Sequence, residues 1–228
     1  MDALKKIFSF SVGRKYLMAF TGLFLSIFLV EHLYGNLLLY CDDAGAAFVE
    51  YSHTMVHSIL IRIVEIVLFL AIVIHAVQAL LLTLRNKKAR PIGYAVNKPS
   101  ANSNWYSRNM GLTGSVILFF LVVHLNNFFV PYRITGLEAD ENVAMEVKEA
   151  FESIWYCLLY VVATIILGFH LNHGFASSFQ TLGLNNKAYG KIVKCIGTCF
   201  AILMTLGFIS FPILFHFDLV GHTIVLAH

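Results

Sequence analysis

Five long apolar runs, separated by shorter polar stretches, divide the chain. They lie near residues 14–40, 58–84, 109–131, 154–178 and 192–216. Each is long enough to form a helix across the roughly 30 Å hydrocarbon core of a bilayer, which takes about 20 residues. The pattern predicts an all-α membrane protein with five transmembrane helices, in which residues 1–228 form one integral-membrane domain.

The composition agrees with this pattern. Hydrophobic residues make up 58% of the chain and charged residues 13%, whereas soluble domains carry about 25% charged residues. No polar segment is long enough for a soluble domain. Any soluble chemistry linked to this chain is therefore expected on partner chains.

Lysine and arginine gather before the first run and in the second and fourth connections, which would all lie on one side of the membrane. By the positive-inside rule this side is the cytoplasm, with the N-terminus inside and the C-terminus outside. Topology therefore explains the positive charge without nucleic acid, although contact with anionic lipid would add to it. On the acidic outer side, 132–153 is predicted to form a short surface helix. The inner basic residues, 13 of the 16 in the chain, are Lys5, Lys6, Arg14, Lys15, Arg85, Lys87, Lys88, Arg90, Lys98, Arg108, Lys187, Lys191 and Lys194.

The four cysteines do not form a disulfide framework. Cys41 and Cys157 would both face outward, so a disulfide between them stays open, while Cys195 and Cys199, one turn apart in the fifth run, are best explained by packing. No Cys-x-x-Cys-His motif occurs, which excludes the usual covalent attachment of c-type haem.

Histidines carry the chemical signal. His32, His75, His124 and His170 lie one in each of the first four runs, and His173 follows one turn after His170. Polar side chains at membrane depth are costly, usually face the protein interior and mark function. The histidines expected at the outer surface are His53, His57, His216, His222 and His228.

Depth divides the four buried histidines into two pairs. At 1.5 Å per residue, His32 and His124 lie ~25 Å and ~24 Å above the inner edge of the membrane. His75 lies ~15 Å above that edge, and His170 lies ~27 Å below the outer edge. The sequence therefore predicts an outer pair, His32 with His124, and an inner pair, His75 with His170.

Two facing imidazoles suit haem iron better than zinc. Zinc usually takes four protein ligands, or three and a water, whereas haem iron takes two axial ligands and a four-helix core is a common place for a cofactor. We expect two haem b groups in a bundle of helices one to four. Bis-histidine ligation leaves no open iron position, which favours electron transfer. A proton relay in a transporter is the alternative, but it would not require pairs of equal depth.

An internal repeat supports the pairing. Residues 21–33 read TGLFLSIFLVEHL and residues 113–125 read TGSVILFFLVVHL. The run IHAVQA likewise aligns with FHLNHG, which matches His75 to His170 and leaves His173 as the fallback ligand. The Thr-Gly pairs are expected to allow close approach of a porphyrin or of a neighbouring helix.

Four stretches together resemble a known family. They are RKYLMAFTGLFLSIFLVEHL, IHAVQALLLTLRNKKARP, TGSVILFFLVVHL and HLNHGFASSFQTLG. In order and spacing they look like the membrane cytochrome b subunit of succinate dehydrogenases and fumarate reductases, of the single-subunit, five-helix, two-haem type. The last stretch is the most specific and resembles the b558 branch. The resemblance covers four helices, and the fifth fits by position only.

The resemblance implies a membrane anchor for a flavoprotein and an iron–sulfur subunit on the cytoplasmic face of the bacterial inner membrane. Electrons would pass between succinate or fumarate and a quinone, menaquinone by analogy, through both haems. His75 and His170 would bind the proximal haem, and His32 and His124 the distal one. A dimer of the whole complex is compatible with the family. Leu171 stands where some relatives carry a glutamate implicated in proton movement, so that proton path is not implied here.

The quinone site is only weakly marked in the sequence. A quinone needs an apolar slot and polar groups near its carbonyl oxygens, and the outer-half candidates are Glu31, Glu50, His53, His57 and Glu65. Arg62 precedes Glu65 by three residues, so an ion pair between them is expected as well.

The chain alone is expected to lack dicarboxylate chemistry, because it has no flavin or iron–sulfur motif. The partner surface would comprise the basic segments 85–108 and 180–194. The rival functions are the cytochrome b anchor of a hydrogenase or formate dehydrogenase, against which the repeat and HLNHGFASSFQTLG argue, and a transporter with buried histidines.

Overall fold

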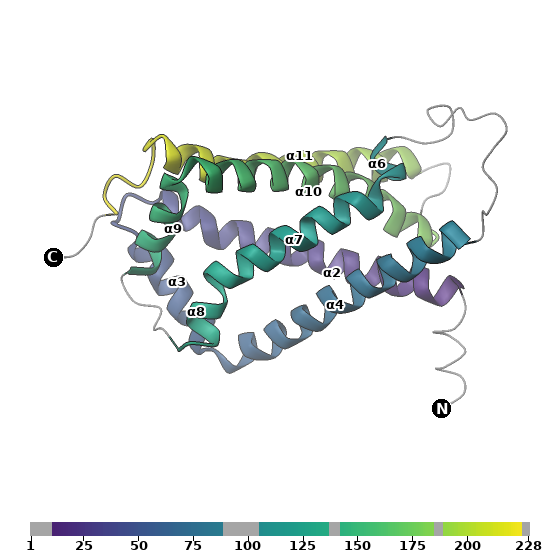
Figure 1. Cartoon of the computed structure of the whole chain (residues 1–228), viewed down its shortest axis with the longest axis horizontal. Helices are drawn as coiled ribbons and strands as arrows, with labels where there is room; N and C mark the ends of the chain where they lie inside the picture. The colour runs from purple at the N-terminus through teal and green to yellow at the C-terminus, as the bar shows by residue number, and fades with distance from the viewer. Residues whose placement is uncertain (1–10, 89–104, 137–141, 185–188, 225–228) are drawn as a thin grey trace.

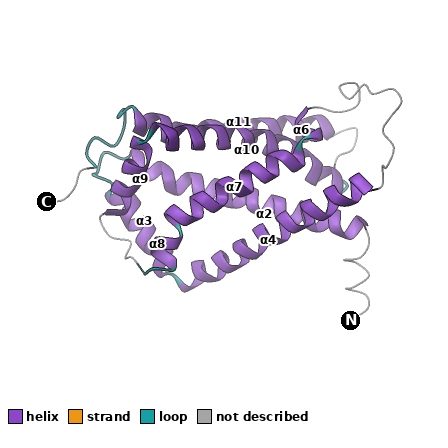
Figure 2. Ribbon diagram, in the orientation of Figure 1, coloured by secondary structure: helices purple, strands orange, loops and turns teal. Residues whose placement is uncertain are grey.

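The computed structural model describes residues 11–88, 105–136, 142–184 and 189–224, and these are helical with no strand (Figures 1 and 2). Five helices are long and apolar enough to cross a membrane. The predicted all-α, five-span, multi-pass membrane protein is therefore confirmed. The five are α2 (Ser11–Leu37, extended by the 3-10 turn η1, Leu38–Tyr40), α4 (Ile59–Lys88), α7 (Met110–Phe128), α10 (Ile154–Thr181) and α11 (Gly190–His216).

The helix ends differ from the predicted ones for local reasons. α4 continues to Lys88, so Arg85 and Lys87 lie in its last turn rather than in a loop, where positive charge is favourable near the helix C-terminus. α7 ends at Phe128, before the separate short helix α8 (Val130–Arg133) that carries a proline in its first turn. A proline has no backbone N–H to continue the α7 hydrogen-bond ladder.

The four histidine-bearing helices are neighbours in space. α2 packs on α4 and α10, and α7 packs on the same two helices from the other side. α11 lies against α10 and α2 and carries none of the four histidines (Figure 1). Side chains from α2, α4, α7 and α10 can therefore meet between the helices.

Shorter helices cover one end of the molecule. α3 (Ala46–His57), α8 and α9 (Asn142–Glu152) all lie there (Figure 1). The surface helix predicted within 132–153 does form as α9, but one face is buried: Val143, Ala144, Val147 and Phe151 belong to the main hydrophobic core. Hydrophobic burial fixes this helix against the others.

His216 lies in a more buried position than expected. His216, expected at the surface, is partly buried, and its Nδ1 donates a hydrogen bond of 2.9 Å to the carbonyl oxygen of Phe151. It thus joins α11 to α9. Glu138, Asp140 and Glu141 lie outside the described residues, as do Lys5, Lys6, Arg90, Lys98, Lys187 and His228.

All three basic residues of the predicted outer side are paired with carboxylates. Arg62 and Arg133 both contact Glu65, and the Lys148 Nζ lies 3.6 Å from a carboxylate oxygen of Asp218. Lys148 also donates to the carbonyl oxygens of Gly221 and Ile224, at 3.1 and 3.3 Å. Each of these exceptions to the charge bias therefore has a carboxylate partner, with Arg62 and Arg133 sharing that of Glu65.

The four cysteines are free thiols. Cys157 is buried, and its thiol donates to the carbonyl oxygen of Pro212 at 3.3 Å, while Cys41 is exposed. The disulfide between them left open above is thus not formed. Cys195 and Cys199 are exposed, so the expectation that they serve helix packing is wrong.

α10 and α11 approach each other closely at Gly168. A Cβ at this position would lie 2.2 Å from Thr205 Oγ1, whereas a Cβ at Gly174, six residues along α10, would meet nothing within 4 Å. The absence of a side chain at Gly168 therefore sets the distance between the two helices.

We expect Gly168→Ala to destabilise the protein by about 1–3 kcal/mol through overpacking. Thermal unfolding in detergent measures this, with Gly174→Ala as the matched control that causes no loss. Adding Thr205→Ala to Gly168→Ala removes the clashing oxygen and should restore most of the stability. Equal melting temperatures for the two single variants would contradict the packing account.

Candidate functional site

The inner histidine pair joins α4 to α10. The ring centroids of His75 and His170 lie 6.3 Å apart, with an angle of 65° between the ring planes. The pair predicted from depth is therefore in contact. The ring that faces His75 is that of His170, which the sequence favoured over His173.

Each ring of the inner pair contacts a buried threonine of a neighbouring helix. His75 Nδ1 lies 3.0 Å from Thr21 Oγ1 on α2, and His170 Nδ1 lies 3.4 Å from Thr113 Oγ1 on α7. Both threonines are at most 8% exposed. The two contacts are equivalent by the internal repeat.

The hydroxyl protons of these threonines are already used. Thr21 Oγ1 donates to the carbonyl oxygen of Leu17 at 2.8 Å, and Thr113 Oγ1 donates to that of Met110 at 3.1 Å. With each hydroxyl proton on its carbonyl, the threonine oxygen is left to accept from an imidazole that carries its proton on Nδ1. Nε2 keeps its lone pair, as a metal-binding imidazole requires.

The glycines of the Thr-Gly pairs lie against the same rings, tightly at Gly22 and at ordinary contact distance at Gly114. A Cβ at Gly22 would lie 3.3 Å from His75 Cε1, and one at Gly114 would lie 3.6 Å from His170 Cε1. The close approach expected at Thr-Gly is thus made by an imidazole of the facing helix. In the first repeat Thr21 offers a hydroxyl to His75 and Gly22 leaves space for its ring.

The outer pair joins α2 to α7. The ring centroids of His32 and His124 lie 5.6 Å apart, with an angle of 89° between the planes. Phe28 and Phe208 lie against His32, at centroid distances of 5.3 and 5.8 Å. Aromatic side chains thus surround this pair.

His124 has a hydroxyl partner of a different kind. Its Nδ1 lies 2.9 Å from the Tyr160 hydroxyl, which lies 3.0 Å from the Tyr156 hydroxyl. Asn127 Nδ2 in turn donates to the Tyr156 oxygen at 2.8 Å. A short chain of polar groups therefore leads from His124 through α10 and back to α7.

The two pairs lie at separate levels. Thr21, which contacts the inner pair, precedes His32 of the outer pair by 11 residues on α2, and Thr113 precedes His124 by 11 residues on α7. At 1.5 Å per residue the two levels are ~16 Å apart along the helices.

Near the inner pair, a buried polar atom has no hydrogen-bond partner among the described residues. It is Oε1 of Gln78, which follows His75 by three residues and so lies on the same side of α4. A buried amide oxygen without a partner costs about 1–3 kcal/mol. This side of α4 therefore has hydrogen-bonding capacity for a further polar group.

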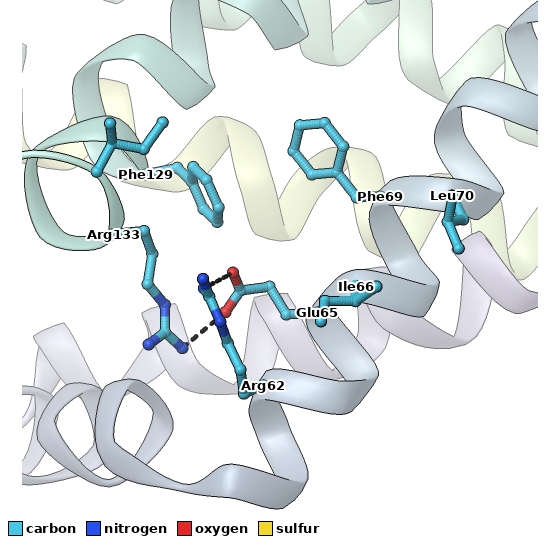
Figure 3. A pocket seen from close by; sticks show the side chains of 8 residues that line it. Arg62, Glu65, Ile66, Phe69, Leu70, Phe129 and Arg133 are labelled. Carbon is cyan, nitrogen blue, oxygen red and sulfur yellow. Dashed lines mark hydrogen bonds and ion pairs between the residues drawn. The ribbon is translucent and has the colours of Figure 1, made fainter.

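A cavity of about 390 Å³ lies between α4 and the α7–α8 junction (Figure 3). Glu65 lies at its edge between two arginines, with carboxylate oxygens 2.5 Å from Arg62 and 2.7 Å from Arg133. The expected Arg62–Glu65 ion pair is present, and Arg133 extends it. The lining residues are Arg62, Glu65, Ile66, Phe69, Leu70, Phe129, Arg133 and Ile134.

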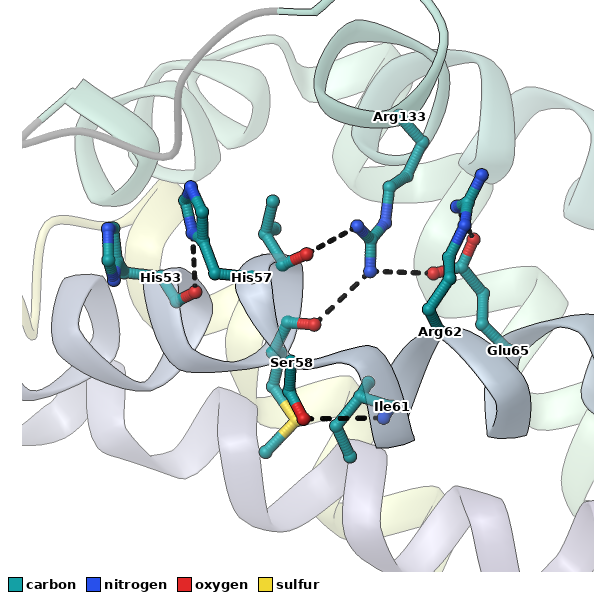
Figure 4. Close-up of polar contacts among 9 residues, drawn as sticks. His53, His57, Ser58, Ile61, Arg62, Glu65 and Arg133 are labelled. Carbon is teal, nitrogen blue, oxygen red and sulfur yellow. Dashed lines mark hydrogen bonds and ion pairs between the residues drawn. The ribbon is translucent and has the colours of Figure 1, made fainter.

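Arg133 also holds the end of α3. Its guanidinium donates to the carbonyl oxygens of Val56 and Met55, at 2.6 and 3.2 Å, while it contacts Glu65 on α4 (Figure 4). The Arg133 and Glu65 side chains are 15% and 16% exposed, whereas Arg62 is 45% exposed. Arg133 is thus the more buried partner of Glu65.

Glu31 has a separate partner on α3. The Tyr51 hydroxyl donates to its carboxylate, and the Tyr51 ring packs so closely on α2 that a Cβ at Gly35 would overlap it. Burial, and then the hydrogen bond to Glu31, raises the pKa of Tyr51. Tyr51 therefore stays a neutral hydrogen-bond donor.

The remaining quinone candidates lie on α3. His53 and His57 stack with ring centroids 4.0 Å apart, and both are exposed, as is Glu50. Of the five candidates, Glu65 alone lines a cavity described here. Within the described ranges, no three histidine, cysteine or acidic side chains are grouped to hold a metal ion.

Comparisons with known proteins identified no relative of this chain. The chain was compared with protein-family models, curated proteins and solved structures, and none of the three comparisons finds a match. The function is therefore inferred from the residues and their contacts.

Two residues of the site escape sequence reasoning. Tyr160 lies within an apolar run, where a tyrosine gives no sign of its partner. Arg133 carried a signal, because it is one of only three basic residues on the acidic side. An isolated charge beside a transmembrane run warrants a search for its partner.

We expect Arg133→Met to destabilise the protein by about 2 kcal/mol, since Glu65 and two carbonyl groups lose a charged donor. Arg62→Met is the matched control and should cost about 0–1 kcal/mol, because that pair is more exposed. Thermal unfolding of both variants in detergent measures the difference. Equal losses would show that Arg133 is no more important than a surface partner.

Proposed function

We propose that this chain is the dihaem cytochrome b membrane anchor of a succinate:quinone oxidoreductase, either a succinate dehydrogenase or a fumarate reductase. In this proposal α2, α4, α7 and α10 form a four-helix bundle that holds two haem b groups, one at each histidine pair. The observation that carries the proposal is the presence of two facing imidazole pairs at two levels. The motif resemblance described above supports the choice of complex.

The spacing of the rings fits two axial ligands. Imidazoles that bind one metal ion from opposite sides, through bonds of about 2.0–2.1 Å, have ring centroids roughly 6 Å apart. The inner pair, at 6.3 Å, agrees with this value, and the outer pair, at 5.6 Å, needs an opening of a few tenths of an ångström. Two ligands at each level do not complete a zinc site.

The donor chemistry agrees as well. Threonine acceptors would leave Nε2 of His75 and His170 free to bind iron, and Gly22 leaves space for the ring of His75. The buried amide of Gln78 could bind a polar edge of the cofactor. When bound, haem b supplies reversible one-electron transfer. The chain's own part would be to hold the group through the two histidines at each level and to surround it with apolar side chains.

We place the quinone, menaquinone by family analogy, in the cavity beside Glu65. Its walls are apolar, and its polar side chains converge on one edge. Arg62 and Arg133 can only donate hydrogen bonds, whereas Glu65 can accept a proton. In this scheme the arginines bind a quinone oxygen and Glu65 receives the proton of a quinol hydroxyl.

The charge pattern supports the placement of partners. The N-terminus and the basic ends of the helices would face the bacterial cytoplasm, where flavoprotein and iron–sulfur subunits would bind. The chain would have no succinate or fumarate activity alone. A hydrogenase or formate dehydrogenase anchor is the rival redox function, and a histidine-containing transporter is the rival of another class.

We expect the purified chain to show b-type absorption bands in a reduced-minus-oxidised spectrum, with about two haems per chain. His75→Ala should remove the inner haem, because one axial ligand is lost, while the outer haem persists. His32→Ala should do the converse. Haem content and the spectra of the two variants measure this.

His53→Ala is the matched control, because this histidine is exposed on α3 and should leave both haems in place. A haem-free wild-type chain that still inserts into membranes would refute the dihaem proposal and favour a transporter. Co-purification with a flavoprotein would distinguish the succinate or fumarate complex from the other redox anchors.

We expect Glu65→Gln to slow reduction of the haems by a menaquinol analogue about 100-fold, as general-base contributions are of this size, with both haems retained. Stopped-flow absorbance of membranes measures the rate. Glu50→Gln, on an exposed carboxylate of α3, should leave it unchanged. An unaltered rate in Glu65→Gln would move the quinone site elsewhere.

A further inference from the structure

The two histidine levels differ in what holds their rings. Inner-pair imidazoles contact threonine hydroxyls whose protons are bound to backbone carbonyls. At the outer level His124 contacts the phenol of Tyr160, whose own proton has a choice of partner. The difference therefore concerns the hydrogen-bond partners of the histidines and not the histidines themselves.

We propose that Tyr160 is the positioning residue of the outer haem site: it accepts a hydrogen bond from the Nδ1–H of His124, turns Nε2 toward the space shared with His32, and donates its own hydroxyl hydrogen bond to Tyr156. The inference rests on the proposed dihaem function and adds to it a side chain that tunes one haem and not the other.

The chain of hydrogen bonds allows this direction. The Tyr160 hydroxyl, which accepts at 2.9 Å from His124 Nδ1, can donate across 3.0 Å to the Tyr156 oxygen. Tyr156 also accepts from Asn127 Nδ2 at 2.8 Å. In the reverse direction Tyr160 would donate to Nδ1, which would leave the proton of His124 on Nε2. That nitrogen could not then bind iron.

Packing keeps the Tyr160 hydroxyl in place. The residue is 8% exposed, and the rings of Phe120 and Phe151 meet it edge-on at centroid distances of 4.7 and 5.1 Å. The ring of Tyr156, four residues earlier on α10, also contacts Tyr160, with a centroid distance of 4.7 Å. The phenol therefore has little freedom to turn away from His124.

An acceptor at Nδ1 makes an imidazole a stronger ligand. A hydrogen bond from the ligating histidine to an outer partner fixes the ring and raises its basicity, and loss of such a partner typically weakens metal binding about 10–100-fold. A more basic ligand favours the oxidised iron. Tyr160 is thus expected to lower the reduction potential of the outer haem.

The test is Tyr160→Phe in the full-length membrane protein, with haem content, a redox titration and low-temperature electron paramagnetic resonance as readouts. We expect an upward shift of the outer-haem potential, an altered outer-haem resonance and haem retention reduced about 10-fold or more at that site. The inner haem should be unchanged. Tyr156→Phe should shift the outer haem in the same direction by less.

Two controls separate positioning from general damage. Thr113→Val removes the acceptor of His170 and should shift the inner haem alone. Tyr40→Phe removes a phenol that bonds to Ser210 rather than to a histidine, and should shift neither haem.

Each outcome bears on a defined claim. If the wild type carries two haems and Tyr160→Phe leaves the outer-haem potential and resonance unchanged, the positioning role is refuted while the dihaem function stands. Equal shifts of both haems in Tyr160→Phe would also refute it. If Tyr160→Phe loses the outer haem entirely, an upward shift in Tyr156→Phe supports the role and no shift there overturns it. A wild type without haem would refute the underlying function instead.

Discussion

A hydrocarbon environment offers an imidazole no hydrogen-bond partner, and this constraint shapes the interior of the protein. Three of the four intramembrane histidines, His75, His124 and His170, have a hydroxyl of another helix at Nδ1. A threonine can serve there because its own proton bonds to a carbonyl of the preceding turn, so the buried hydroxyl is itself satisfied. At these three histidines, polar burial is thus organised in small hydrogen-bonded units rather than as isolated side chains.

Much of the fold was predictable, because hydropathy over 20-residue windows is a strong signal. The five spans and the pairing of His32 with His124 and of His75 with His170 follow from it and from counting residues along straight helices. The Thr-Gly repeat was visible in the sequence too, but its contacts with the histidines of the facing helices were not. Such contacts depend on the rotation of each helix about its axis, which an almost wholly apolar sequence hardly encodes.

The end of the molecule that carries α3, α8 and α9 was harder to predict for a different reason. The burial of α9, the hydrogen bond of His216 to Phe151 and the bridge from Arg133 to α3 are contacts between segments distant in sequence. Amphipathic helices of this length can lie at a membrane surface or pack on protein, and their own residues do not distinguish the two cases. The exposure of Cys195 and Cys199 is likewise decided by which face of α11 meets α10.

The threonine–imidazole contacts also cross-link antiparallel helices. Thr21 joins α2 to His75 of α4, and Thr113 joins α7 to His170 of α10. A slip of either pair by one turn would displace one atom by ~5.4 Å along the helix axis, beyond hydrogen-bonding reach. Apolar side chains alone would tolerate such sliding, since one leucine packs much like the next. The axial register of α2 against α4, and of α7 against α10, is therefore marked in each case by one small polar contact deep in the bundle.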